Sequence, residues 1–300
     1  MGLPPYHPFR SAEARASYLA GYRRRAAHWP VPSEDAWIDT SFGRTYARVS
    51  GPADAPPLVL LPGIGASSLM WSQMVGPLSQ RRRVIAVDAI QDHGLSVSTR
   101  LLRCAADYVG WLDELWVGLG LEGGTDLVAA SYGGWMAVEL ALVHPQRLRR
   151  LVLIAPVGAV LRLDTGFVAR ALLARVPVRC CFRRFMAWLA PGLAHADGTA
   201  RGLFDEMVDD GFTALRWFEP RRPVYPRRLS NEEWARMSVP ILFLAGEGDV
   251  VFPVRRAVER LLRVAPQVRT EVLPGVGHDL FVLKAEDAAG RILRFLDAGS

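Results

Sequence analysis

The sequence predicts an α/β fold with a mostly parallel central sheet, helices on both faces and one inserted helical segment. Short apolar runs, typical of strands buried on both faces, alternate with helical patterns along most of the 300 residues. Such alternation implies right-handed crossovers and parallel strands. The residues from 157 to 238 interrupt it, because they show only helical and loop patterns and are rich in aromatic side chains.

The elements before the alternating part are a helix and a pair of strands. A helix is expected over residues 11–27, with Ser11 as its N-cap and Glu13 in its first turn. Two short strands follow in "AWIDT" and "TYARVSG", on either side of the turn "SFGR".

The alternating part contains the remaining strands. Buried strands are predicted in "PPLVLLPG", "RRVIAVD", "TDLVAAS", "RLVLIAP" and "VPILFLAG", with helices at about 68–79, 101–119, 133–144 and 254–264. "RTEVLPG" predicts a last strand and "EDAAGRILRFLDA" a last helix. The expected organisation is an N-terminal helical extension over 1–30, a core formed by 31–156 and 239–300, and a helical cap inserted over 157–238.

The composition is that of an ordinary globular protein, with 50% hydrophobic and 22% charged residues. No apolar run approaches the roughly 18–20 residues of a membrane span, and the first 30 residues do not resemble a signal peptide. We therefore expect no membrane span and a cytoplasmic location. Cys104, Cys180 and Cys181 agree, because their spacing suits neither a disulfide framework nor a zinc site.

The formal net charge of +6 raises the question of a nucleic-acid partner. The arginines are mostly scattered. Where they gather, as in "RRR" at 23–25 and 81–83 and in "RRPVYPRR" at 221–228, no nucleic-acid-binding motif accompanies them. We therefore expect no nucleic-acid partner, and the sequence leaves the formation of a homo-oligomer open.

The stretch "LVAASYGGW" places Ser131 between a buried strand and a helix. Ligands and catalytic groups in open parallel sheets gather at the carboxyl ends of strands. A nucleophile on a tight strand-to-helix elbow needs small residues two positions before and after it. Ala129 and Gly133 fill these places. A simple packed turn would show the same pattern, so this motif alone does not distinguish a nucleophile from a structural serine.

An acid and a histidine follow two later strands, in "LFLAGEGDVVFP" and "LPGVGHDLFV". A serine hydroxyl needs a histidine base, which in turn needs a carboxylate to orient it. Asp249 and His278 suit these roles, with Glu247 and His93 as the respective competitors. The order Ser131, Asp249, His278, with each residue after a strand, favours a catalytic triad over packing.

Acyl transfer also needs backbone N–H groups aimed at the developing oxyanion. The amides of Ile64, after "LVLLPG", and of Tyr132, at a helix N-terminus, are the candidate donors. Met70, Trp71 and Trp135 lie near the predicted site and, with the aromatic cap, predict an apolar pocket under a lid. No metal-ligand spacing is present, and this chemistry needs neither a metal nor an organic cofactor.

These motifs resemble the α/β-hydrolase superfamily, in the manner of serine esterases and lipases. "LVLLPGIGASSLMW" is similar to the oxyanion-loop region, "VAASYGGW" to the nucleophile elbow, "AGEGDVVFP" to the acid loop and "GVGHDLF" to the histidine loop. The opening segment, through "FGRTYARVSGPADAPPLVLLPG", resembles bacterial carboxylesterases of the naproxen-esterase type. Two positions depart from the family pattern: Pro62 stands where histidine is usual, and Ala129 where glycine is usual.

The resemblance implies a serine hydrolase that cleaves small apolar or aromatic carboxylic esters through an acyl-enzyme. Another triad hydrolase, namely a lactonase, thioesterase, amidase or C–C bond hydrolase, stays open because one scaffold supports many chemistries. Epoxide hydrolase and dehalogenase chemistry is disfavoured, because those relatives place aspartate at the position of Ser131. The alternative outside the enzymes is a ligand-binding protein without turnover. The presence of Ser131, Asp249 and His278 together argues against it.

Overall fold

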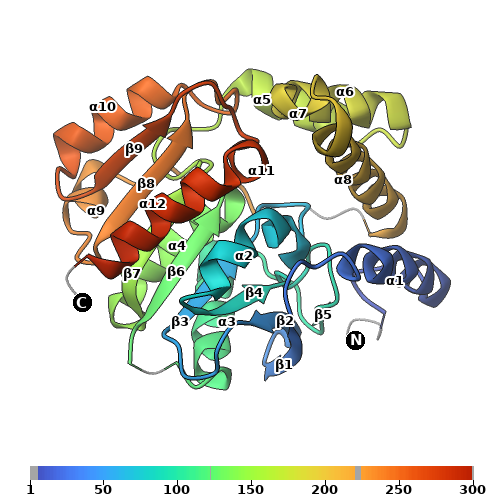
Figure 1. The fold of residues 1–300 in the computed structure, drawn as a ribbon, viewed down its shortest axis with the longest axis horizontal. Coiled ribbons are helices and arrows are strands. Elements are labelled where there is room, and N and C mark those ends of the chain that lie inside the picture. The colour runs from blue at the N-terminus through green and yellow to red at the C-terminus, as the bar shows by residue number, and fades with distance from the viewer. Residues whose placement is uncertain (1–5, 122, 220–223, 299–300) are drawn as a thin grey trace.

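The computed structural model describes residues 6–121, 123–219 and 224–298, which fold around a nine-stranded sheet (Figure 1). The strands are β1 (Glu34–Thr40), β2 (Gly43–Ser50), β3 (Pro57–Leu61), β4 (Arg83–Val87), β5 (Val97–Ser98), β6 (Thr125–Ala130), β7 (Leu148–Ile154), β8 (Ile241–Gly246) and β9 (Arg269–Leu273).

The order of the strands is β1-β2-β4-β3-β6-β7-β8-β9, with β5 paired to β2. The pairs β1–β2, β2–β4 and β2–β5 are antiparallel, whereas all pairs from β4–β3 to β8–β9 are parallel. Leu61 pairs with Ala129, and Ala130 pairs with Ile154, so β3, β6 and β7 end at nearly the same level. The segments that follow these strands therefore meet at one edge of the sheet.

Helices cover both faces of the sheet, as the buried apolar strands require. The helix α2 packs against α12 on one face, and α3 packs against α4 on the other (Figure 1). The helices and helical turns around the sheet, on both faces together, are η1 (Ser68–Trp71), α2 (Ser72–Ser79), α3 (Ala105–Gly118), α4 (Tyr132–Val143), η2 (Pro145–Arg147), α9 (Asn231–Ala235), α10 (Val254–Val264), α11 (Leu280–Leu283) and α12 (Ala285–Asp297).

In the described residues between β7 and β8 there are four further helices, which we call the cap helices: α5 (Thr165–Leu173), α6 (Arg179–Leu189), α7 (Pro191–Ala194) and α8 (Gly198–Trp217). The N-terminal helix α1 (Ala12–Ala26) packs against α8 (Figure 1). Phe9 lies just before α1 and forms a bridge with Phe218, just after α8. The N-terminal extension is therefore attached to the cap helices.

The predicted fold class is confirmed, and most of the predicted elements lie within a few residues of the observed ones. Ser11 caps α1 as expected, because its hydroxyl accepts a hydrogen bond from the Ala14 amide at 3.1 Å. The two-residue strand β5 and the short helix α11 were not predicted, since elements of two to four residues leave no periodic pattern. Within the described ranges, no helix has the length and apolarity needed to cross a membrane.

Candidate active site

Ser131 occupies a sharp turn between β6 and α4. Its backbone has φ 52° and ψ −116°, which an L-residue adopts only under strain. Backbone hydrogen bonds fix this turn: the Ser131 amide donates to the Ile154 carbonyl at 2.8 Å, and the Ser131 carbonyl accepts from the amides of Gly134 at 3.0 Å and Val157 at 3.1 Å. A Cβ at Gly133 would lie 2.5 Å from the Pro62 carbonyl oxygen, so only glycine fits there.

The loop after β3 passes directly over the elbow. A Cβ at Gly63 would lie 3.2 Å from the Cβ of Ser131. The next residue, Ile64, has an exposed fraction of 54%, and it lines the cavity above Ser131. The Gly65 amide donates to the carboxylate of Asp92, at 3.2 Å to Oδ1 and 3.1 Å to Oδ2. Asp92 therefore braces this loop, a role that the sequence alone did not reveal.

Ser131, His278 and Asp249 form one hydrogen-bonded row. The Nδ1 atom of His278 lies 2.8 Å from Oδ2 of Asp249, and its Nε2 atom lies 3.2 Å from Oγ of Ser131. Asp249 and His278 are both buried, with exposed fractions of 9% and 7%. With Nδ1 protonated and donating to the carboxylate, Nε2 is free to accept the proton of the serine hydroxyl.

The surroundings of Asp249 and His278 hold both residues in place. The other carboxylate oxygen of Asp249 accepts a hydrogen bond from the Val251 amide at 2.8 Å. Asp279 is buried next to His278 and accepts hydrogen bonds from the amides of Gly277 and Leu193, both at 3.1 Å. Because Leu193 belongs to α7, Asp279 joins the histidine loop to the cap helices. Asp279 was missed because its role depends on this distant contact.

The two competing residues lie in different surroundings. Glu247 is exposed, and its amide donates to the Leu273 carbonyl at 2.9 Å as part of the extension of the β8–β9 pair. His93 lines the cavity, and its ring packs 4.9 Å from that of Phe218 and 6.4 Å from that of Tyr18. His278 is the histidine that the structure places against both Ser131 and Asp249.

A cavity of about 720 Å³ extends from Ser131 and His278 up into the cap helices. Its wall is mainly apolar and includes residues from α5, α6 and α8. The lining residues on these three helices include Phe167, Phe185, Met186, Leu189, Met207 and Ala214. The volume and apolar wall suit a small apolar ligand.

The structure corrects part of the predicted pocket. Met70 lines the cavity, and its sulfur lies 3.4 Å from the Gly63 amide. Trp71 and Trp135, by contrast, are not among the described residues that line the cavity, and both are almost fully buried in the core. The Trp135 indole donates to Glu139 Oε1 at 3.0 Å, and its ring packs behind Tyr132, with 5.0 Å between the ring centroids.

Two polar contacts involve residues that line the cavity. Arg25 on α1 forms an ion pair of 2.5 Å with Asp210 on α8, and both residues line the cavity. Burial raises the pKa of Asp210, while the positive charge of Arg25 acts in the opposite direction. The Tyr132 hydroxyl donates to the Val224 carbonyl at 2.7 Å, and burial raises the pKa of this phenol.

Within the described ranges, no group of three or more His, Cys, Asp and Glu side chains is arranged to hold a metal ion. Cys104, Cys180 and Cys181 are free thiols.

The fold and the hydrogen-bonded row together define the chain as an α/β hydrolase. The model of the alpha/beta hydrolase family matches residues 58–291, and the protein belongs to this family. The carboxylesterase nap of Bacillus subtilis (strain 168) is 29% identical over 283 residues, which cover 94% of this chain and 92% of that protein. Carboxylesterase YbfK of the same organism is 27% identical over 297 residues, covering 97% of each chain.

A solved structure agrees with this comparison. The crystal structure of naproxen esterase (carboxylesterase NP) from Bacillus subtilis superimposes with a TM-score of 0.87 at 28% sequence identity. The match covers 96% of this chain and 100% of the naproxen esterase chain. The similarity therefore includes the N-terminal extension and the cap helices as well as the sheet.

Proposed function

We propose that this protein is a serine hydrolase that cleaves carboxylic esters with apolar or aromatic groups. The observation that carries the proposal is the row formed by Ser131, His278 and Asp249 at the floor of an apolar cavity. The similarity to two carboxylesterases over nearly the whole chain supports an ester as the substrate.

In the first step, Ser131 Oγ attacks the carbonyl carbon of the ester and its proton passes to Nε2 of His278. The carboxylate of Asp249 stabilises the imidazolium that forms. The oxyanion of the tetrahedral intermediate accepts hydrogen bonds from the amides of Ile64 and Tyr132. The intermediate collapses when His278 protonates the leaving alkoxide, which departs as an alcohol and leaves an acyl group on Ser131.

In the second step, a water molecule takes the place of the alcohol. His278 accepts one proton of the water, and the oxygen attacks the acyl carbon. The second tetrahedral intermediate releases the carboxylic acid as the proton returns to Ser131. Water, the ester and the three side chains supply every proton and electron pair in this sequence.

The cap over residues 157–238 is, in this proposal, the part that selects the substrate. The phenyl rings of Phe167 and Phe185 lie 6.3 Å apart at the cavity wall, and the indole of Trp188 packs 6.2 and 6.1 Å from them. Such a wall excludes water and favours aryl or branched aliphatic groups. Met70 also lines the cavity, where its sulfur lies next to the Gly63 amide in the loop after β3.

A fluorophosphonate probe tests the nucleophile, because it reacts only with an activated serine. We expect one covalent adduct on Ser131 in the wild type and none in Ser131→Ala, with folding unchanged by circular dichroism. A panel of aryl and alkyl esters, lactones, thioesters, amides and C–C bond substrates then tests the reaction. Labelling with no preference for esters would point to another hydrolase on this fold, and the absence of labelling would point to a binding protein.

A cytoplasmic location is also part of the proposal. It is supported by the three free thiols, of which Cys104 and Cys180 are exposed and would be oxidised readily outside a reducing compartment. Fractionation of cells expressing the natural full-length protein tests it: we expect the activity in the cytoplasmic fraction.

A further inference from the structure

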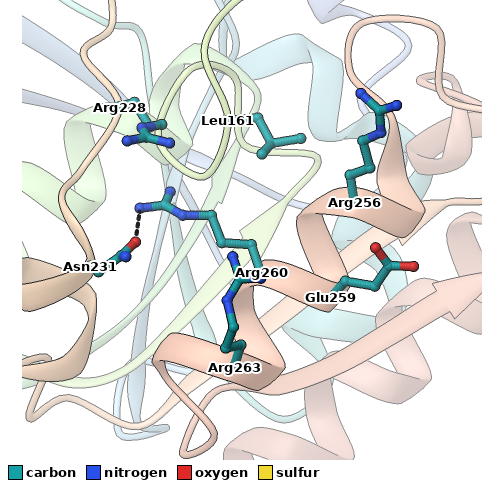
Figure 2. A pocket seen from close by; sticks show the side chains of 7 residues that line it. All are labelled: Leu161, Arg228, Asn231, Arg256, Glu259, Arg260 and Arg263. Carbon is teal, nitrogen blue, oxygen red and sulfur yellow. Dashed lines mark hydrogen bonds between the residues drawn. The ribbon is translucent and has the colours of Figure 1, made fainter.

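A second pocket, of about 410 Å³, lies beside α10 and is lined mainly by arginine side chains (Figure 2). We call it the arginine pocket. The residues that line it are Leu161, Arg228, Asn231, Arg256, Glu259, Arg260 and Arg263. Arg256, Arg260 and Arg263 are spaced by four and three residues along α10, so they lie on one face of the helix.

Arg260 is the buried centre of this pocket, with an exposed fraction of 5%. Its guanidinium donates hydrogen bonds to the carbonyls of Val160 and Leu229, the latter at 2.7 Å, and to Oδ1 of Asn231 at 2.9 Å. All three partners are neutral. The arginine is therefore held in place by dipoles, without a carboxylate to balance its charge.

These bonds join the two segments that connect the cap helices to the sheet. Val160 belongs to the segment 155–164 after β7, and Leu229 to the segment 224–230 before α9. The two segments also contact each other, because the Leu229 amide donates to the Ala159 carbonyl at 3.0 Å. The first segment separates the two pockets: Val157 and Leu163 line the active-site cavity, whereas Leu161 lines the arginine pocket.

The charges in the arginine pocket are not balanced within the described part of the chain. None of its four arginines forms an ion pair with a carboxylate there, whereas the neighbouring Arg227 pairs with both Glu139 and Glu233 at 2.8 Å. Two carboxylates are near. Glu259 lines the pocket, but its side chain points away from the guanidinium of Arg260 (Figure 2), and Glu232 interacts with Arg260 through its charge alone.

The cluster is electrostatically unfavourable as it stands. Burial and the positive charges of Arg228 and Arg263 lower the pKa of Arg260 below its ordinary value, and Glu232 offsets only part of this. Like charges gathered around a concave surface raise the local concentration of counter-ions. Guanidinium groups match the oxygens of phosphate with parallel, charge-assisted hydrogen bonds.

We propose that the arginine pocket is a binding site for a phosphate group, with Arg228, Arg260 and Arg263 as its principal donors and Arg256 at its rim. The bound group sits where both connecting segments of the cap meet α10. The site is separate from Ser131, and the proposal does not depend on the ester-hydrolase function. A phosphate group can belong to a small soluble anion or to a phospholipid headgroup, and the pocket's chemistry is the same for both.

Titration calorimetry and thermal unfolding of the full chain test this site. The probes are inorganic phosphate and inorganic pyrophosphate, each compared with chloride at equal ionic strength. We expect saturable binding of one or both, and a rise in Tm that follows the ligand concentration. Vesicles of phosphatidylglycerol, compared with phosphatidylcholine, form the second arm, and binding to these alone would assign the site to a headgroup.

Charge-reversal variants localise the binding. Arg228 and Arg263 are exposed, so Arg228→Glu and Arg263→Glu leave the bonds of Arg260 intact. Each should weaken the affinity at least about tenfold. Arg255→Glu is the matched control, because Arg255 is exposed on the same helix but does not line the pocket. Equal affinities in Arg263→Glu and Arg255→Glu, or no binding to any probe in the wild type, would overturn the proposal.

Discussion

The imidazole of His278 lies between Asp249 and Ser131, with 2.8 Å from Nδ1 to Asp249 Oδ2 and 3.2 Å from Nε2 to Ser131 Oγ. These residues come from three different loops, and the ends of β6, β8 and β9 bring them together. Each loop is fixed by its own backbone hydrogen bonds, so the row exists before any substrate binds.

The first prediction concerns Asp249. In Asp249→Asn the amide can no longer hold the Nδ1–H tautomer, so kcat should fall on the order of 10³–10⁴-fold at neutral pH. The matched control is Glu247→Gln, which changes an exposed acid in the same loop. Steady-state rates on an aryl ester give both values. Near-normal turnover in Asp249→Asn would mean that another acid orients His278.

A second prediction compares two histidines. Replacing His278 by alanine should remove nearly all turnover, since no other base contacts the Ser131 hydroxyl in the described structure. His93→Ala enlarges the cavity next to Phe218 and should change KM more than kcat. The ratio of the two kcat values is the measurement, and the opposite ranking would refute the assignment of the base.

The third prediction concerns Asp92 as a positioning residue. Its carboxylate accepts the Gly65 amide in the loop that carries Ile64. In Asp92→Ala we expect kcat to fall roughly tenfold with little change in KM, less than the ~10²–10³-fold that follows loss of an oxyanion donor itself. Asp92→Asn keeps an acceptor oxygen and should restore most of the rate. A loss of equal size in both variants would argue against the bracing role.

Gly133 provides a fourth prediction, on stability. A methyl group there would lie 2.5 Å from the Pro62 oxygen and 2.9 Å from the Leu61 oxygen, so Gly133→Ala should separate the elbow from β3. We expect a loss of about 1–3 kcal/mol in the free energy of unfolding, together with reduced turnover. Gly202→Ala is the control, because Gly202 is exposed within α8 with open space around an added Cβ, and the change should be neutral or stabilising.

The fifth prediction concerns pH and the ion pair between Arg25 and Asp210. Arg25→Ala leaves the Asp210 carboxylate in a buried site without its partner, which should cost about 1–3 kcal/mol of stability at neutral pH. Removal of the cation raises the pKa of Asp210 further, and an acid with a raised pKa in the folded state loses stability as the pH rises through that value.

The penalty should therefore shrink as the pH is lowered, and it should be smallest below about pH 4, where Asp is protonated in both states. Urea unfolding at several pH values measures it. Arg24→Ala is the matched control, because Arg24 is an exposed neighbour on the same helix. A penalty that is independent of pH would show that Arg25 acts through packing rather than charge.

Much of the fold was predictable from the sequence because buried parallel strands are nearly continuous apolar runs. Ser131, Asp249 and His278 stood out for a related reason: a polar residue directly after such a run has a defined place at the edge of the sheet. Asp92 and Asp279 also follow strands, β4 and β9. Their contacts with Gly65 and Leu193 join segments that are distant in the sequence, so no local pattern distinguishes these two residues from surface acids.

The tryptophans show the opposite case. Trp71 follows Met70 on a single turn of helix, and adjacent helical residues point in different directions. Met70 therefore lines the cavity while Trp71 enters the core. Their hydrophobicity is similar, so the sequence cannot assign one to a substrate and the other to packing. The arginines of α10 were equally ambiguous, because helical spacing alone does not say whether a basic face meets acids or solvent.

The attachment of α1 to α8 has a practical consequence for anyone who produces this enzyme. Arg10 and Arg25 lie before the first strand, yet both contribute to the wall of the cavity above Ser131. An affinity tag or a shortened start could thus alter which esters are accepted without touching the catalytic machinery. Fusion partners are better placed at the other end, after α12, and selectivity screens can begin with the first thirty residues.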